Sequence, residues 1–273
     1  LIDKNGVWWL SKNRVFPNKA MENVDIAFPV LLGPNGEDGK IQGLFVMLGV
    51  PYVGGDVTSS ALAMDKEFSK IIWEKYGLPV VNFVAIRKEG MRNQSFENLN
   101  LKYPVFVKPA NLGSSIGVKK VNKKENLEEA INEAFLFGDK VTIEEAVGEV
   151  RELYVSLLGN ENVDVSVVGE IVSVNEFFDY EAKYNNRDSE VKIPAPISKE
   201  LEEQIKNTAI NAFRLLGLSG ISRVDFLLNN KTKKHYVSEI NTMPGFTPLS
   251  MYPKLWEATG LSYKDLLTKL ITL

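Results

Sequence analysis

Apolar residues recur every three or four positions in several parts of the chain, a spacing that places them along one face of a helix. The longest stripe follows Ser198, a residue type that caps helix N-termini, and stops at Gly217. Its members are Leu201, Ile205, Ala209, Ala212, Phe213 and Leu216. A second helix is expected to begin at Ser59 or Ser60 and to end at Gly77. Its stripe is formed by Met64, Phe68, Ile71 and Ile72.

Three shorter helices are predicted from the same spacing. The first covers residues 41–48. The second follows Asn122 and Glu125, which have the spacing of a capping box. It is expected to pack through Leu127, Ala130, Ile131, Ala134 and Phe135. The third begins at Ser262, with Asp265 at capping-box spacing, and is expected to pack through Leu266, Leu267 and Leu270.

Short apolar runs bounded by turn-forming residues predict the strands of the amino-terminal part. Residues 28–32 and 51–55 flank the helix predicted at 41–48, and the turn-forming run 33–39 follows the first strand. Strands that alternate with a helix in this way indicate a parallel sheet, and therefore an α/β lobe.

The remaining strands are expected to pair antiparallel. Residues 103–109 and 141–145 are single strands, and three β-rich segments between 152 and 174 are typical of a meander. Residues 222–228 and 235–241 are joined by polar, turn-compatible residues and are predicted to form a hairpin.

Polar side chains are grouped on this hairpin. Because successive side chains of a strand point to opposite faces, Arg223 and Asp225 share one face of the first strand. By the same parity, Glu239 and Asn241 share one face of the second. Two carboxylates and an amide carbonyl are hard oxygen ligands that suit Mg²⁺, which takes its other ligands from phosphates and water. An ATP–Mg²⁺ site is the natural interpretation.

The alternative to a metal site is a solvated strand face on which Arg223 forms a surface salt bridge. Two observations bear on this choice. Val237 has the same parity as Glu239, so the apolar pattern does not fix which side faces a cleft. Residues 242–247 turn sharply after the proposed ligands, however, and the backbone N–H of Gly245 can stabilise a developing oxyanion. The turn favours a functional site.

A lysine and a small-residue loop form a second candidate site. Lys108 ends a predicted strand, and the loop that contains Ser114 and Ser115 can surround phosphate oxygens with N–H and hydroxyl donors. The spacing of a P-loop is absent from the sequence. Lys66, which opens another helix, can reach the same phosphates. Without Lys108 the loop would be interpreted as a plain connection between strands.

Composition limits the classes of function. The 273 residues carry a formal net charge of −3, with 44% hydrophobic and 25% charged residues, which is ordinary for a soluble folded protein and gives no attraction to nucleic acid or to an anionic membrane. There is no cysteine, so disulfides and a cysteine nucleophile are excluded, and a cytoplasmic location is expected. No apolar run is long enough for a membrane span. Because the chain starts at Leu1, an upstream segment is expected to be missing.

Six motifs, in order along nearly the whole chain, resemble those of the D-alanine–D-alanine ligases. They are Gly36–Gly43, Met64–Lys66, Val107–Pro109 with Gly113–Ser115, Tyr180–Tyr184, Ser222–Asp225 and Glu239–Gly245. Each motif alone is weakly to moderately specific, and it is their order and spacing that make chance similarity improbable.

The resemblance implies an ATP-grasp fold, in which α+β lobes hold ATP between two sheets. Residues 1–64 would be an incomplete amino-terminal substrate lobe (the pre-ATP-grasp lobe), residues 65–150 the central lobe and residues 151–273 the catalytic lobe. The implied activity is the ATP-dependent joining of two D-alanines through an acylphosphate, for peptidoglycan precursors. The implied cofactors are ATP and two Mg²⁺ or Mn²⁺ ions. Relatives are commonly homodimers.

The resemblance also implies roles for single residues. Phosphates would be held by Lys66, Lys108, Ser115 and Lys183, and the adenine by Glu144, Glu145 and Val147. Phe177 would lie on the adenine ring, and Glu152 would bind the ribose hydroxyls. The metal ligands would be Asp225, Glu239 and Asn241.

The implied catalytic residues are Arg223, Gly245, Tyr184 and Ser114. Arg223 and the Gly245 N–H would stabilise the tetrahedral oxyanion, and Ser250 would contact the carboxylate of the second substrate. Tyr184 lies in a polar loop with residues 185–189, which resembles the family's mobile flap over the active site, and it favours an amine as second substrate. The alternative for this tyrosine is an aromatic anchor of a loop.

The chain departs from the family pattern at two places. Leu32 stands where the family usually has a histidine, and the upstream segment that carries a glutamate for the first substrate is absent from this sequence. Two other functions therefore stay open. One is a D-alanyl-D-serine ligase, whose second-substrate pocket would be shaped by residues 246–251. The other is an ATP-binding protein without catalytic activity.

Overall fold

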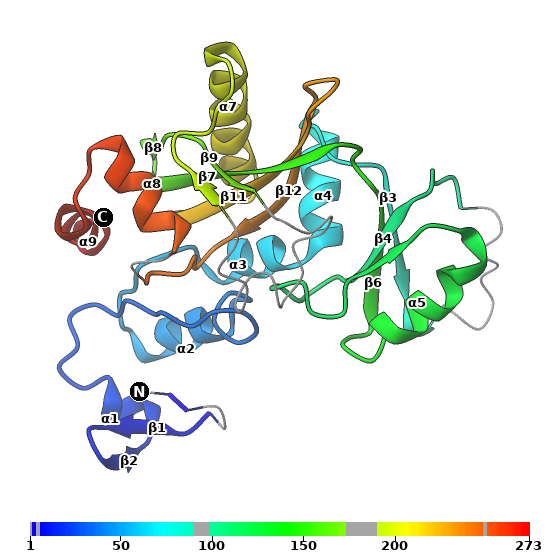
Figure 1. The fold of residues 1–273 in the computed structure, drawn as a ribbon. Coiled ribbons are helices and arrows are strands. Elements are labelled where there is room, and N and C mark those ends of the chain that lie inside the picture. Colours follow the sequence, from blue (N-terminus) through cyan, green and yellow to red (C-terminus); the bar gives the residue numbers. More distant parts are fainter. Residues whose placement is uncertain (1, 4–5, 90–98, 173–189, 248–249) are drawn as a thin grey trace.

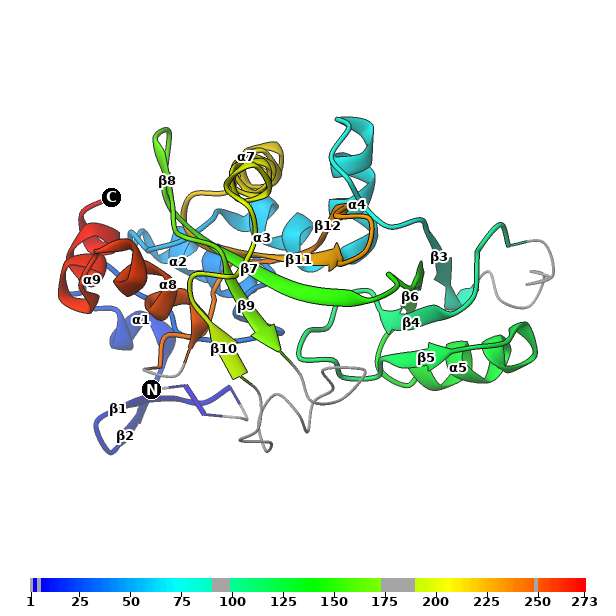
Figure 2. The same cartoon turned by 45° about the horizontal axis from the view of Figure 1, so that its top comes forward.

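Two antiparallel sheets lie beside each other, and each has a helix packed on one face (Figure 1). The computed structural model describes residues 2–3, 6–89, 99–172, 190–247 and 250–273. Figure 2 shows the same two sheets from another direction, with the smaller one at the far end of the long strand β7. The mixed helix and sheet content agrees with the expected class.

The larger sheet has the order β10-β9-β7-β11-β12, with β8 beside β7. Its strands are β7 (Val150–Gly159), β8 (Val163–Val165), β9 (Gly169–Val172), β10 (Glu190–Lys192), β11 (Gly220–Asn229) and β12 (His235–Asn241). The hairpin of β11 and β12 is confirmed. The segments predicted as a meander are antiparallel, but β8 and β9 both pair with β7, at different positions along it.

Helix α7 (Lys199–Leu215) covers one face of this sheet, and its predicted apolar stripe is buried in the main hydrophobic core. The hydroxyl of Ser198 accepts a hydrogen bond from the N–H of Leu201 at 3.3 Å, so the predicted cap is confirmed. The cap satisfies one of the N–H groups that a helix start leaves without a partner, which fixes where the helix begins.

The smaller sheet has the order β3-β6-β4-β5 and is covered by α5 (Leu127–Ala134). Its strands are β3 (Phe83–Arg87), β4 (Val105–Pro109), β5 (Lys119–Val121) and β6 (Lys140–Glu145). All five predicted apolar positions of the helix are buried. The predicted capping box is wrong, because a 3-10 turn, η3 (Lys124–Asn126), precedes the helix and Asn126 takes the N-cap position.

The amino-terminal part contains the hairpin of β1 (Trp8–Leu10) and β2 (Asn13–Val15), the short helix α1 (Pro17–Ala20) and α2 (Lys40–Leu48). The prediction of α2 is confirmed. The strands predicted at 28–32 and 51–55 are wrong, since the parallel pairing is a single bridge between Ala27 and Tyr52. Pro29 lacks the N–H group that would extend the ladder.

The helix predicted between Ser59 and Gly77 is two helices, α3 (Val57–Met64) and α4 (Lys66–Lys75). Both serines lie inside α3, whose cap is Asp56, and Asp65 breaks the path in an extended conformation and caps α4. The predicted stripe is also wrong in part. Phe68 is 44% exposed, while Trp73, outside that stripe, is fully buried.

Helix α4 lies where the two sheets approach each other (Figure 1). Trp73 belongs to the core of the larger sheet, and its indole N–H donates to the carbonyl of Ala212 on α7 at 3.1 Å. At its start the helix is tied to the smaller sheet, since Lys140 of β6 forms ion pairs with Asp65 and Glu67. The helix therefore connects both sheets.

The chain ends in two helices, α8 (Met251–Thr259) and α9 (Tyr263–Thr272). The cap of α9 is confirmed, because the Ser262 hydroxyl accepts from the N–H of Asp265 at 3.2 Å. Helix α8 was not predicted, although Tyr252 and Trp256 are buried on one side of it. Over the described residues, the helices are too short or too polar to cross a membrane.

Candidate active site

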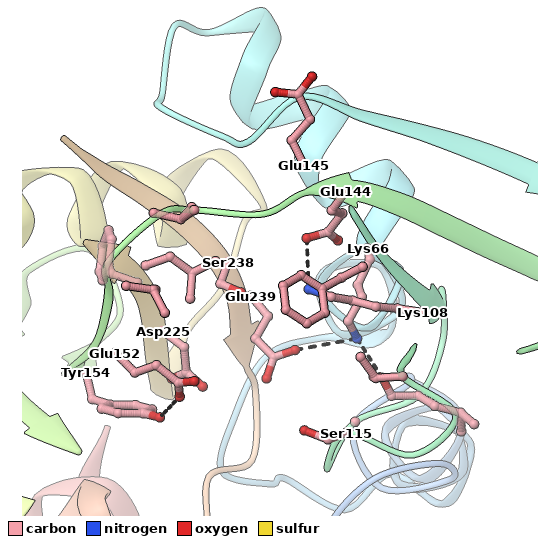
Figure 3. A pocket seen from close by; sticks show the side chains of 18 residues that line it. Lys66, Lys108, Ser115, Glu144, Glu145, Glu152, Tyr154, Asp225, Ser238 and Glu239 are labelled. Atoms are coloured by element: carbon pink, nitrogen blue, oxygen red, sulfur yellow. Dashed lines mark hydrogen bonds and ion pairs between the residues drawn. The ribbon is translucent and has the colours of Figure 1, made fainter. Parts of the chain in front are cut away.

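A cavity opens between the two sheets, where β4 and β6 face β7, β11 and β12 (Figure 3). From the side of the smaller sheet it is lined by Lys66, Lys108, Ser115, Glu144, Glu145 and Val147. From the larger sheet come Glu152, Asp225 and Glu239. Residues predicted from segments far apart in the sequence are thus brought together around one space.

A buried ion-pair cluster forms the inner end of the cavity. The carboxylate of Glu144 lies 2.9 Å from the ammonium of Lys108 and 3.6 Å from that of Lys70. Burial disfavours the charged form of Glu144, but the ammonium groups of Lys108 and Lys70 prevail and lower its pKa to about 2. Burial likewise opposes the charge of Lys108, and Glu144 raises the pKa of this lysine above its usual value. Glu144 and Lys108 are therefore ionised at neutral pH.

Lys66 joins this cluster to the opposite wall. Its ammonium donates to the carbonyl of Leu112 at 2.6 Å and lies 3.5 Å from the carboxylate of Glu239 (Figure 3). Lys66 and Lys108 therefore place two positive charges on one side of the cavity, opposite the carboxylates of β11 and β12. Such an arrangement suits a polyanion that carries cations, such as a metal–nucleotide complex.

The hairpin brings the proposed metal ligands together. Asp225 lies opposite Glu239 in the register, and Arg223 lies opposite Asn241. The side-chain amide of Asn241 donates to the Asp225 carboxylate at 3.2 Å. Three oxygen-bearing side chains from two neighbouring strands thus occupy the same end of the hairpin.

A β-bulge explains why the apolar pattern of β12 gave an ambiguous parity. Glu239 pairs with Asp225 but Val237 pairs with Phe226, so Ser238 is an extra residue between them. Val237 is consequently buried in the core although Glu239, two residues on, lines the cavity. The bulge turns the polar face of β12 toward the cavity.

Arg223 holds Asp225 in a bidentate ion pair, with Nε–Oδ1 at 2.6 Å and Nη2–Oδ2 at 2.7 Å. The guanidinium also lies over the ring of Tyr154, 5.2 Å from its centroid. The Tyr154 hydroxyl donates to Glu152 at 2.7 Å. Burial, followed by the charge of Glu152, raises the pKa of Tyr154 well above its ordinary value, so it stays a neutral donor.

The donor set can be tested against the expected metal. Among the described residues, no group of three or more His, Cys, Asp or Glu side chains is arranged to hold a metal ion by itself. Asp225 and Glu239 supply two carboxylates and Asn241 an amide oxygen, which is the incomplete, oxygen-only set that Mg²⁺ uses when phosphates complete its shell. The residues fit Mg²⁺ or Mn²⁺ brought in with a nucleotide.

The loop after β4 has an unusual backbone. Ser114 and Ser115 have φ angles of 53° and 58°, in the left-handed region that side chains other than glycine rarely adopt. Ser115 lines the cavity beside Gly113, whereas Ser114 is outside its lining. Strained loop conformations of this kind concentrate at functional sites.

The two glutamates at the end of β6 point in different directions. Glu144 turns toward the lysines, whereas the side chain of Glu145 points away from the cavity in Figure 3. Its carboxylate accepts hydrogen bonds from the Asn82 side chain and from the N–H of Lys102, both at 2.9 Å. Glu145 and Val147 therefore form the edge of the cavity between β6 and β7, and the Glu145 carboxylate is directed elsewhere.

The turn after β12 carries the last predicted residues. A Cβ placed on Gly245 would lie 2.8 Å from the hydroxyl of Ser250, which also accepts from the N–H of Thr247 at 3.0 Å. Gly245 and Ser250 are thus in contact, at the start of α8. Both lie outside the cavity lining, as do Arg223 and Asn241. Phe177, Lys183 and Tyr184 lie outside the residues that the structure describes.

Sequence reasoning missed three buried groups near the cavity. Lys70 lies one helical turn after Lys66, a spacing that indicates a shared helix face. Tyr154 has the strand parity of Glu152, which was a usable signal. Glu37 lies in the predicted turn 33–39, and nothing in its local pattern indicates that it is buried against the turn after β12.

Glu37 accepts a hydrogen bond from the N–H of Gly33 at 2.6 Å, and its carbonyl accepts from the Thr242 hydroxyl at 3.2 Å. Burial is the main reason that the pKa of Glu37 rises to about 6, and the charge of Glu239 raises it further, against the hydrogen bond from Gly33. Leu31 also reaches this region, with its N–H 3.2 Å from the sulfur of Met243. The amino-terminal turn is thus packed against the turn after β12.

Two family models match the chain. The model described as "D-ala D-ala ligase C-terminus" matches residues 72–272, and the one described as "D-ala D-ala ligase N-terminus" matches residues 2–55. A D-alanine–D-alanine ligase of Acetivibrio thermocellus is 48% identical over 263 residues, which are 94% of this chain and 69% of that protein.

Solved structures agree with these matches. The VanG D-Ala:D-Ser ligase from Enterococcus faecalis superposes with a TM-score of 0.84 at 40% identity, over 92% of this chain and 73% of that one. The D-alanine–D-alanine ligase from Bacillus anthracis, solved with ATP, gives a TM-score of 0.80 at 29% identity, over 93% and 80% of the two chains.

Proposed function

Because the chain belongs to the D-alanine–D-alanine ligase family, with its ATP-grasp fold, we propose that it uses ATP to join two D-alanines into D-alanyl-D-alanine for cell-wall precursor synthesis. The observation that carries the site assignment is the cavity between the sheets. Lys66 and Lys108 face Asp225 and Glu239 across it, so one wall suits phosphates and the other suits their metal ions.

The nucleotide would lie along this cavity. Lys66, Lys108 and Ser115 would hold its phosphates, and the edge between Glu144 and Val147 would hold the adenine. Glu152, fixed by the Tyr154 hydroxyl, would accept from the ribose. For Phe177 and Lys183 the expected roles stand on the family resemblance.

Two Mg²⁺ or Mn²⁺ ions would be held by Asp225, Glu239 and Asn241, and they would neutralise the charge of the transferred phosphoryl group. Other residues of the chain would stabilise the charge that develops on the intermediate. Arg223, aligned by its ion pair and by the Tyr154 ring, would stabilise the oxyanion together with the N–H of Gly245. Ser114, in the strained loop, would offer its hydroxyl and N–H to phosphate oxygens.

The reaction then follows in two steps. A carboxylate oxygen of the first D-alanine attacks the γ-phosphorus of ATP, and the bond to the bridging oxygen breaks to release ADP. The neutral amine of the second D-alanine attacks the carbonyl carbon of the acylphosphate, the bond from that carbon to the phosphate oxygen breaks, and phosphate leaves together with the proton that the amine loses. Ser250 would bind the carboxylate of the second substrate, and Tyr184 would cover the site so that water does not hydrolyse the acylphosphate.

The assignment is tested by ADP and phosphate release from Mg-ATP with and without D-alanine. D-alanine should accelerate release, with dipeptide formed in equal amount. Equal rates with and without the amino acid would contradict a ligase.

A second candidate is a ligase that accepts D-serine as the second substrate. The similarity to a D-Ala:D-Ser ligase at 40% identity favours it. Product analysis with equal D-alanine and D-serine separates the two activities, since the dominant dipeptide identifies the preferred second substrate.

The chain would divide into three lobes near residues 64 and 150, with the nucleotide held between the second lobe and the third.

A homodimer through the amino-terminal lobe is the expected assembly, and Val46 and Met47 of α2 are exposed apolar residues available for it. Light scattering would report the mass of a dimer, or of a single chain if this expectation is wrong.

A further inference from the structure

Lys70 is a buried lysine to which the proposed reaction gives no role. Its side chain is fully buried, one helical turn after Lys66 on α4, and it is not part of the cavity lining. A lysine in such a place is costly, and burial lowers its pKa. A group held there at this cost needs a physical reason.

Its contacts show what it joins. The ammonium of Lys70 donates to the carbonyl of Ser238, the extra residue of the β12 bulge, at 3.0 Å. On the other side it lies 3.6 Å from Glu144 of β6. Lys66, four residues earlier on the same helix, likewise connects Leu112, after β4, with Glu239 of β12. Helix α4 therefore bridges the two cavity walls twice.

The charges around Glu144 are the second observation. This carboxylate is 3% exposed and has two cationic neighbours, Lys108 at 2.9 Å and Lys70 at 3.6 Å. Only Lys108 lines the cavity. If Lys108 turns to a phosphate, Glu144 loses its nearer partner, and a buried carboxylate without a partner is strongly unfavourable.

We propose that Lys70 is a positioning residue that stays with Glu144 when Lys108 turns to the phosphates of the nucleotide, and that holds the β12 bulge beside it. Lys70 thereby lowers the free-energy cost of moving the Lys108 ammonium from the Glu144 carboxylate to the ligand. This inference rests on the proposed binding of Mg-ATP in the cavity. Lys70 itself touches neither substrate nor metal.

The test compares ligands with and without phosphates. Lys70→Met should weaken binding of Mg-ATP by about tenfold or more, because Lys108 is then retained by Glu144, and should change binding of adenosine by less than about twofold. Titration calorimetry reports all of these affinities.

Lys75→Met is the matched control, because Lys75 is an exposed lysine in the last turn of the same helix. This variant should bind both ligands like the unaltered protein. Unchanged Mg-ATP affinity in Lys70→Met would overturn the inference. An equal loss of adenosine and Mg-ATP would also overturn it, because it would show a general disruption of the fold.

A structure of the unaltered protein with Mg²⁺ and a non-hydrolysable ATP analogue decides the matter even if the variants do not fold. Lys108 should contact a phosphate and Lys70 should remain beside Glu144. Lys108 still paired with Glu144, or Lys70 displaced from it, would contradict the inference. Absence of Mg-ATP binding by the unaltered protein would instead contradict the proposed function.

Discussion

Arg223 and Asp225, two residues apart on β11, form a bidentate ion pair that joins the proposed oxyanion-binding group to a proposed metal ligand. Both side chains are largely buried, at 20% and 13% exposed, and the ring of Tyr154 supports the guanidinium from one side. Two groups that would act on different atoms of the same intermediate are therefore aligned by each other before substrates bind.

Arg223→Lys should lower kcat by about 100-fold, because the ammonium cannot form the two parallel hydrogen bonds of the guanidinium or stack on Tyr154 in the same way. Dipeptide formation at saturating substrates measures this. Arg87→Lys is the control, since Arg87 also makes a two-bond contact with a carboxylate, that of Glu67, but away from the cavity. Similar rates in both variants would argue against a catalytic role for Arg223.

The pKa of Glu37 predicts a dependence of stability on pH. Burial raises this pKa from 4.5 to about 6, so the folded state binds a proton that the unfolded state has lost between these values. The stability that protonated Glu37 supports is complete below pH 4.5 and is lost as the pH rises through 6. Glu37→Gln imitates the protonated form and should be more stable than the unaltered protein at pH 7.5, by about 2 kcal/mol, and equally stable at pH 4.5.

Urea unfolding at the two pH values measures this difference. Glu22→Gln is the control, because Glu22 is an exposed glutamate in the same lobe and should show no such pH-dependent gain. If Glu37→Gln is destabilised equally at both pH values, its side chain acts through hydrogen-bond geometry and not through its ionisation.

Glu144 predicts the opposite dependence of stability on pH. Its pKa is lowered to about 2, so its contribution to stability is present above pH 4.5 and is lost as the pH falls toward 2. Glu144→Gln leaves two buried ammonium groups without their carboxylate and should lower the free energy of unfolding at pH 7 by about 3 kcal/mol.

The comparison for Glu144 is Glu133→Gln, which breaks an exposed pair with Lys119 and should lower stability far less, because solvent screens that pair. Unfolding curves of the two variants at pH 7 separate a buried cluster from a surface pair. Equal losses would mean that the cluster around Glu144 contributes no more than a surface salt bridge.

Gly220 is expected to be intolerant of a side chain. It has a φ of 72°, and a Cβ would lie 2.9 Å from the backbone nitrogen of Gly54, where the amino-terminal part meets the start of β11. Gly220→Ala should lower the free energy of unfolding by about 2–4 kcal/mol, the sum of backbone strain and overpacking. Gly217→Ala isolates the strain, because its φ is 69° and its Cβ would meet open space. Equal losses would show that the contact with Gly54 relaxes freely.

Regular periodicity made part of the fold predictable. The helix after Ser198 and the hairpin of β11 and β12 follow from local spacing, and both are confirmed. The break at Asp65 could not be predicted, because an aspartate can stand either inside a helix or at its N-cap. Which of the two it adopts depends on tertiary contacts that the local sequence does not show. The bulge at Ser238 was equally hidden, since an extra residue only shows in the register with the partner strand.

The candidate site was predictable where chemistry is concentrated in short motifs. Asp225, Glu239 and Asn241 were found by parity and Lys108 by its place at a strand end, and they lie near one another in the structure. Lys70 and Glu37 were missed because each is buried against a distant part of the chain, Lys70 against β12 and Glu37 against the turn after it, more than 150 residues further on. Long-range packing of this kind leaves no local pattern.

The transfer of oxygen tests the central claim most directly. If the carboxylate of the first D-alanine attacks ATP, D-alanine labelled with ¹⁸O in its carboxylate must pass one labelled oxygen to phosphate for each dipeptide formed. Mass spectrometry of the released phosphate measures this. The mechanism predicts one ¹⁸O per phosphate, and unlabelled phosphate released together with dipeptide would contradict it.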